Sequence, residues 1–307
     1  MAGAHAADSV PWVPPEPRHR FVSTRVRRRL VRQPVTLAAG FILGAIFVAG
    51  ALVPQYTSAV AHIHLSQRWL NQPPMLSGWH LLGTDAIGRD MSLRVLYGLH
   101  TSEQSALAAT LFASLIGIVL GGIAGYRGGW LDAAIMRITD LVGVFPALML
   151  LLAIYTWWQP VTAWRATVIF ALFLWVPMAR VVRAEISSLR EREFVQAALS
   201  LGATDGRIFF RHLLPNGSGT IIIAATSLLG QVFVLEATVE FFGLGVPSDL
   251  YPTLGNLIGD GQRNAFALGQ GWWTWAGPAA LLVLILVCVN LLGDGLADAL
   301  RPARSRR

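Results

Sequence analysis

The sequence predicts an all-α protein, a polytopic membrane helix bundle with six transmembrane helices in one continuous domain. The chain has 307 residues, of which 54% are hydrophobic and 13% charged, and its mean hydropathy is +0.54. This composition is too apolar for a domain whose surface faces water. The apolar residues also gather into stretches of about 20, the length that a helix needs to cross roughly 30 Å of hydrocarbon. We place these spans at residues 35–55, 104–125, 138–158, 166–185, 218–239 and 276–296.

The arginine distribution predicts the orientation of the bundle. All 24 basic residues are arginines, and they cluster near the N-terminus, around residues 180–211 and at the C-terminus. Because positive residues favour the cytoplasmic side, we expect both termini and the loop 186–217 in the cytoplasm. Each cluster borders an apolar span, so the net charge of +7 indicates a lipid membrane rather than nucleic acid as the partner.

The ends of the chain differ in composition from its centre. Residues 1–34 are rich in Pro, Ala and Arg, and we expect a mostly disordered cytoplasmic tail rather than a signal peptide, because the polar lead is too long. The first helix and an external segment then occupy residues 35–103. A core of five helices follows at 104–300, and a basic cytoplasmic tail at 301–307.

The sequence lacks features that several classes of enzyme and carrier require. Without a lysine the chain has no phosphate-binding P-loop, so it cannot hydrolyse ATP by that route. It shows no internal repeat of the kind found in many secondary carriers, and no span clearly contains the histidine of a membrane-embedded hydrolase. His62 and His64 have no nearby cysteine or acidic partner, which favours loop histidines over a metal site.

The polar loop 186–217 separates two strongly apolar spans. Residues 193–201 favour an amphipathic helix, Gly202 lies where a helix end needs a positive φ, and Thr204 can cap a second helix over 205–214. We expect Pro215 to end that second helix. A helix–turn–helix of this kind is either a connector on the inner leaflet or a docking element for a cytoplasmic partner.

The stretch "QAALSLGATDGRIFFRHLLPN" resembles the EAA loop of binding-protein-dependent ABC importer permeases. Gln196-Ala197-Ala198, Gly202 and Leu214-Pro215 fall at that pattern's spacing, although Gln196 replaces its Glu and His212 takes an apolar position. Three further stretches resemble C-type subunits of dipeptide and oligopeptide permeases. They are "HLLGTDAIGRDMSLRVLYGLHTS" at 80–102, "FFGLGVP" at 241–247 and "NLLGDGLADALRP" at 290–302.

The resemblance implies a type I ABC importer permease fold in a bacterial inner membrane. It implies a second homologous permease, two ABC ATPase subunits that bind ATP and Mg, and an external lipoprotein that delivers the peptide. This chain would itself hold no catalytic residue, cofactor or metal. Its ATPase-coupling residues would be Glu193, Gln196, Ala197, Ala198, Leu199, Gly202, Ala203, Asp205, Ile208, Phe209, Leu214 and Pro215.

Three residues within the apolar spans are candidates for the translocation pathway or the permease interface. Glu236 is a costly carboxyl at hydrocarbon depth unless it faces protein or water, with snorkelling as the alternative. Pro146 and Pro177 should kink their spans and shape a cavity, although membrane helices also tolerate proline without such a role. Arg137 and Asp140 are spaced for an ion pair within one helix.

The resemblance leaves the cargo open. A haem or nickel chelate could use the same kind of importer, and an ion-coupled secondary carrier is the alternative from another class of protein.

Overall fold

The structure is a computed structural model that describes residues 31, 33–56, 70–75, 80–159, 162–246, 251–268 and 271–300. The predicted N-terminal tail up to residue 30, His62 and His64, and the C-terminal tail 301–307 lie outside the described residues. Within the described ranges the regular structure is helical, apart from one isolated β-bridge between Thr84 and Asp90.

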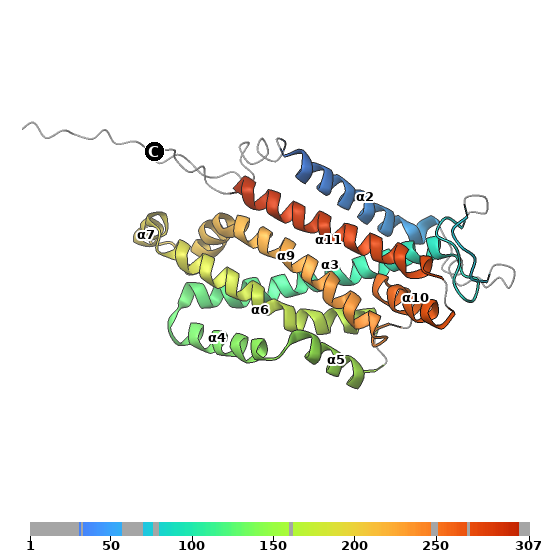
Figure 1. The fold of residues 1–307 in the computed structure, drawn as a ribbon. Coiled ribbons are helices and arrows are strands. Elements are labelled where there is room, and N and C mark those ends of the chain that lie inside the picture. The colour runs from blue at the N-terminus through green and yellow to red at the C-terminus, as the bar shows by residue number, and fades with distance from the viewer. Residues whose placement is uncertain are drawn as a thin grey trace, which may run out of the picture.

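Long apolar helices lie side by side and form the bundle (Figure 1). They are α2 (Pro34–Tyr56), α3 (Met91–Arg127), α6 (Ala163–Arg190), α9 (Leu214–Phe241) and α11 (Trp273–Leu300). Each of the five is long and apolar enough to cross a membrane, and a bent pair, α4 (Gly129–Val144) and α5 (Ala147–Trp157), brings the number to six if counted as one span. The number of spans therefore agrees with the prediction.

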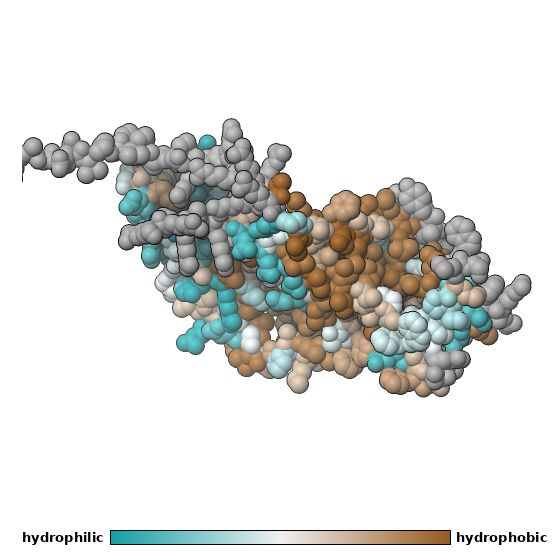
Figure 2. All heavy atoms as spheres, turned by 45° about the horizontal axis from the view of Figure 1, so that its top comes forward, coloured by the Kyte–Doolittle hydropathy of each residue, from teal (hydrophilic) through white to brown (hydrophobic). Residues whose placement is uncertain are grey.

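The short elements mark the two ends of the bundle. In Figure 1, α7 (Glu193–Ser200) lies at one end, while α10 (Leu254–Leu268) lies at the other. Hydrophobic residues form a broad band across the middle of the molecule in Figure 2, and hydrophilic residues gather toward its ends. This is the surface expected of a protein whose centre faces lipid.

The second helix begins well before the predicted span at 104. Asp90 caps α3, since its side chain accepts a hydrogen bond of 3.0 Å from the Leu93 amide. Ser102, Glu103 and Ser105 are too polar for a hydropathy criterion, yet they are buried inside the bundle. Part of the segment predicted to lie between the first two spans is therefore helical, from Met91 onward.

The third span is broken, as the position of Pro146 predicted. Phe145 has an extended backbone (φ −80°, ψ 134°), the conformation that a following proline favours, and α5 starts directly after Pro146. The axes of α4 and α5 differ by 79°. Pro177 lies inside α6, which continues across it as a helix.

A row of glycines brings α3 and α6 into close contact. Gly117, Gly121 and Gly125 are four residues apart and lie against Met178, Ala179 and Arg183 of α6. A Cβ at Gly125 would stand 2.6 Å from the Arg183 carbonyl oxygen, and one at Gly121 would overlap the Ala179 carbonyl. Small residues at this spacing allow membrane helices to approach backbone to backbone.

Candidate functional site

The polar loop 186–217 begins with a helix that ends at Gly202. The Ala203 amide donates to the Ala198 carbonyl (3.1 Å) and the Gly202 amide to the Leu199 carbonyl (2.9 Å), the two bonds of a Schellman motif. Gly202 has a φ of 76°, as the sequence predicted, and no atom lies within 4 Å of a Cβ built on it. Glycine is therefore required by the backbone conformation and not by lack of space.

The second half of the loop continues directly into a membrane span. Thr204 precedes α8 (Asp205–Ile208) in the N-cap position, although its side chain makes no cap bond. A π-helical turn, η2 (Phe209–Leu213), follows, and α9 begins at Leu214. The prediction that Pro215 ends the helix is wrong.

The π turn accounts for the helix continuing through Pro215. Proline has no amide hydrogen, and its ring collides with the carbonyl four residues earlier in a regular α-helix. The Leu214 amide donates instead to the Phe209 carbonyl, five residues back, so the turn is widened just before the proline.

Apolar side chains fasten the loop to the bundle. Val195, Ile208 and Leu213 are fully buried. The Phe209 ring lies against Gly122 of α3, where a Cβ would be 2.6 Å from its Cζ, and packs edge-on against Tyr126. Two predicted coupling residues, Ile208 and Phe209, therefore contact this chain's own helices.

Asp205 ties the loop to the end of α3. The Tyr126 hydroxyl donates to Asp205 Oδ1 at 2.8 Å, and Arg127 Nη2 lies 3.8 Å from Asp205 Oδ2. The Arg190 guanidinium lies 5.9 Å from the centroid of the same tyrosine ring. The ends of α3 and α6 and the start of α8 thus meet around one aromatic side chain.

The outer side of the loop presents apolar and polar side chains to solvent. The predicted coupling residues that are exposed are Glu193, Gln196, Ala197, Leu199, Gly202 and Asp205, whereas Ala198, Ala203, Leu214 and Pro215 are half-buried. Gln196 donates a hydrogen bond of 3.2 Å to the Arg190 carbonyl, which the carboxylate of a Glu at this position could not do.

Sequence reasoning missed three exposed apolar residues of the same surface. Leu201 is 88% exposed and Phe210 70%, and Phe194 is exposed as well. Their apolar character within a polar, arginine-rich loop was the available signal. With Leu199 they give the loop an apolar surface that the described part of the chain leaves uncovered.

Glu236 lies inside the helix bundle, near the end of α9 that is away from the polar loop. Its side chain is 3% exposed, and it interacts with the hydroxyl of Ser102 on α3. Glu240, one turn further on, is equally buried and accepts a hydrogen bond of 3.2 Å from the Val246 amide. Burial within the helices distinguishes Glu236 from a snorkelling residue, and its place in a pathway remains a prediction.

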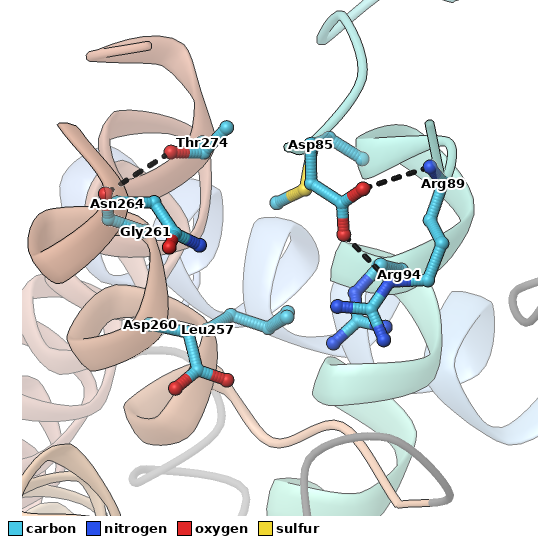
Figure 3. Close-up of a pocket in the computed structure, with 9 residues that line it drawn as sticks. Asp85, Arg89, Arg94, Leu257, Asp260, Gly261, Asn264 and Thr274 are labelled. Atoms are coloured by element: carbon cyan, nitrogen blue, oxygen red, sulfur yellow. Dashed lines mark hydrogen bonds and ion pairs between the residues drawn. The ribbon is translucent and has the colours of Figure 1, made fainter. Parts of the chain in front are cut away.

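A small cavity between α3, α10 and the segment before α3 is lined by charged residues (Figure 3). Its volume of about 20 Å³ is room for a water molecule and not for a peptide. Asp85 accepts hydrogen bonds from the Arg89 amide (2.8 Å) and Nε (2.6 Å) on one side of the cavity. Asp260 on the other side pairs with Arg263 (2.6 Å). The first pair lies within the segment before α3 and the second within α10, and neither suggests a cargo site.

Three relatives cover most of the chain. It is 37% identical over 286 residues to the oligopeptide transport system permease protein OppC of Mycobacterium tuberculosis (strain ATCC 25618 / H37Rv), covering 91% of this chain and 94% of that protein. It is 34% identical over 281 residues to the dipeptide transport system permease protein DppC of Bacillus subtilis (strain 168), with 91% and 85% covered. A putative peptide permease of Brucella suis biovar 1 is 36% identical, with 76% of each chain covered.

The fold has a counterpart among solved structures. A chain of the MetNI methionine ABC transporter in an inward-facing conformation aligns with a TM-score of 0.56 at 19% identity, covering 69% of this chain and 98% of that chain. At such low identity the likeness concerns the fold alone. The model of the binding-protein-dependent transport system inner membrane component matches residues 117–306. With that match spanning the polar loop, and with close relatives along almost its whole length, this chain belongs to that family of permeases.

Proposed function

We propose that this chain is a permease subunit of an ATP-driven importer that takes up dipeptides or oligopeptides. The observation that carries the proposal is the extent of the similarity, because the relatives named as oligopeptide and dipeptide permeases align over 91% of this chain. The identity is 37% to the oligopeptide permease and 34% to the dipeptide permease. It therefore supports a shared task and not merely a shared fold.

The polar loop supplies the physical means of coupling to ATP. Its outer surface offers Leu199, Leu201 and Phe210 to a partner, while Val195 and Ile208 hold it to the bundle. We propose that separate ATPase subunits, which bind ATP and Mg, dock on this surface. Because α8 continues into α9, a displacement of the docked loop would be transmitted directly to a membrane span.

The remaining partners follow from the same proposal. A second, homologous permease would complete the pathway, and an external lipoprotein would deliver the peptide. The complex would lie in the cytoplasmic membrane of a bacterium, with both termini of this chain in the cytoplasm.

Uptake by a reconstituted complex tests the proposal. Proteoliposomes with both permeases, both ATPases and the binding lipoprotein should accumulate radiolabelled di- and oligopeptides only when ATP is supplied. A matched complex whose ATPases lack the P-loop lysine should not accumulate them. Uptake driven by an ion gradient without ATP would overturn the proposal in favour of a secondary carrier. ATP-dependent uptake of a haem or nickel chelate, and not of peptides, would overturn the proposal that the cargo is a peptide.

A further inference from the structure

In the half of α6 that leads to the polar loop, the exposed residues include no large apolar side chain of the kind that lipid contact favours. They are Pro177, Arg180, Ala184, Ser187, Ser188 and Arg190. On α3, by contrast, the exposed residues include an apolar row that recurs every four positions, Leu107, Leu111, Leu115 and Val119. A helix face in contact with acyl chains is apolar, as on α3. The exposed residues of α6 indicate a polar environment.

An ion pair between α4 and α6 lies on this side of α6. Arg180 Nη2 donates to Asp140 Oδ1 at 3.0 Å and lies 3.4 Å from the Thr139 carbonyl oxygen. The guanidinium passes beside Gly143, where a Cβ would stand 3.1 Å from Nη2. The expected partner of Asp140 was Arg137 on its own helix, so the structure corrects that pairing. Asp132 is bound in the same way, through Nε and Nη2 of Arg183.

Both charges of the Asp140–Arg180 pair stay in contact with the surroundings of the chain. The two side chains are 61% and 49% exposed. A guanidinium has five N–H donors, and within the described part of the chain the hydrogen bonds of the Arg180 side chain involve Nη2 alone. The other donors need water or another polar group, because an unpaired donor in hydrocarbon costs several kcal/mol.

The pair also lies within helices of the bundle, away from the end of α6 and from the start of α4. Ten residues separate Arg180 from the end of α6 at Arg190 (190 − 180), which is about 15 Å at 1.5 Å per residue. Asp140 lies eleven residues from the start of α4 at Gly129 (140 − 129), or about 16 Å. Charged residues at such positions in membrane proteins face a bundle interior or a water-filled cavity.

We propose that Asp140, Pro177, Arg180 and Ala184, together called the charged face, line the water-filled path through the transporter. This inference rests on the proposed function, since it assigns the wall of the path that a polar peptide would follow. Because the two charges neutralise each other, this wall would neither retain nor repel the charged termini of a peptide. The path would open along α4 and α6, while the apolar residues of α3 face lipid.

Cysteine accessibility in membranes containing the whole transporter tests the charged face. Cys288 is buried and can be replaced by alanine as a background. Ala184→Cys probes the face without breaking the ion pair, and Leu111→Cys is the matched control on the lipid side. A charged thiosulfonate reacts with a thiolate in water, so we expect Ala184→Cys to react at least tenfold faster than Leu111→Cys in inside-out vesicles. Equal rates would overturn the inference.

Comparing reaction rates in two nucleotide states of the ATPases distinguishes a transport path from a surface that is merely exposed to the cytoplasm. Trapping the ATPases with vanadate should slow the reaction of Ala184→Cys several-fold, because alternating access closes one side of the path at a time. Ser188→Cys, beyond the charged face near the end of α6, should react equally in both states. A rate at Ala184→Cys that does not change with nucleotide would also overturn the inference. These rates do not depend on which cargo is carried, so failure of the peptide proposal would appear only in the uptake assay.

Discussion

Two carboxyl groups of α9 are enclosed by helices at the end of the bundle opposite the polar loop. Glu236 and Glu240 are 3% and 2% exposed, and the Tyr155 side chain of α5 is buried in the same region. One oxygen of Glu240 has no hydrogen-bond partner among the described residues. Polar groups buried in this way destabilise a fold unless they bind another group. Their burial is therefore a reason to test for a role beyond packing.

Replacing Glu236 tests that role. Glu236→Ala removes the acceptor facing Ser102 and leaves a cavity, which should cost about 1–3 kcal/mol without preventing membrane insertion. We expect the variant to assemble and to import peptide more slowly per complex, whereas Glu236→Gln, which keeps the shape and an acceptor oxygen, should retain most uptake. Wild-type uptake by Glu236→Ala would assign the carboxyl to structure alone.

Gly202 tests the geometry of the polar loop. Because no atom lies within 4 Å of a Cβ at this position, a substitution there acts through its φ of 76°. Gly202→Val should cost on the order of 1–2 kcal/mol at the turn and change the angle between α7 and α8. Insertion should persist, but loaded binding protein should no longer stimulate ATPase activity. Asn adopts positive φ readily, so Gly202→Asn is the matched control and should remain coupled. Full stimulation in the valine variant would contradict the coupling role.

At the scale of elements, α3 and α6 are the helices in closest contact with each other. By contrast, α4 is one of the most loosely packed helices of the bundle. The glycine row lets the backbones of α3 and α6 touch, whereas the only fully buried residue of α4 is Thr139. Asp132 and Asp140 of α4 each form an ion pair with an arginine of α6. A helix held by a few polar contacts between a two-glycine turn and a proline break is suited to movement.

A methyl group at Gly121 should separate the tight pair. Its Cβ would overlap the Ala179 carbonyl, so the two backbones must move apart, and overpacking of this kind costs about 1–3 kcal/mol. We expect Gly121→Ala to lower the melting temperature of the complex in detergent. The control is Gly44→Ala on α2, where no atom lies within 4 Å and helix propensity improves. Equal melting temperatures for the two variants would mean that the close approach does not stabilise the bundle.

At the scale of the whole molecule, the loop and the buried acidic residues lie at opposite ends of one continuous helix bundle. α8, η2 and α9 run without interruption from Asp205 to Phe241, and α3 spans the same distance beside them. Asp205 binds Tyr126 at one end of α3, and Ser102 faces Glu236 toward the other. The two helices therefore offer a direct mechanical connection between the faces of the membrane.

The orientation of the bundle predicts where reagents can reach it. If the loop 186–217 is cytoplasmic, Ser188→Cys in a Cys288→Ala background should resist an impermeant thiol reagent in intact spheroplasts. It should be labelled once the membrane is permeabilised, because Ser188 is exposed. Labelling in intact spheroplasts would invert the topology inferred from the arginines.

Local chemistry determined what the sequence could predict by itself. Hydropathy over about 20 residues identified the membrane helices, and the conformational preferences of Gly202 and Pro146 identified a turn and a break, because both depend on nearest neighbours. Only the tertiary structure decided which polar residues are buried and with which partners. Asp140 binds Arg180 and not Arg137, and Tyr126 reaches Asp205. The start of α3 at Met91 and the passage of α9 through Pro215 likewise depend on packing and on a π turn. These contacts join residues that are distant in the chain, and they form only when folding brings their helices together.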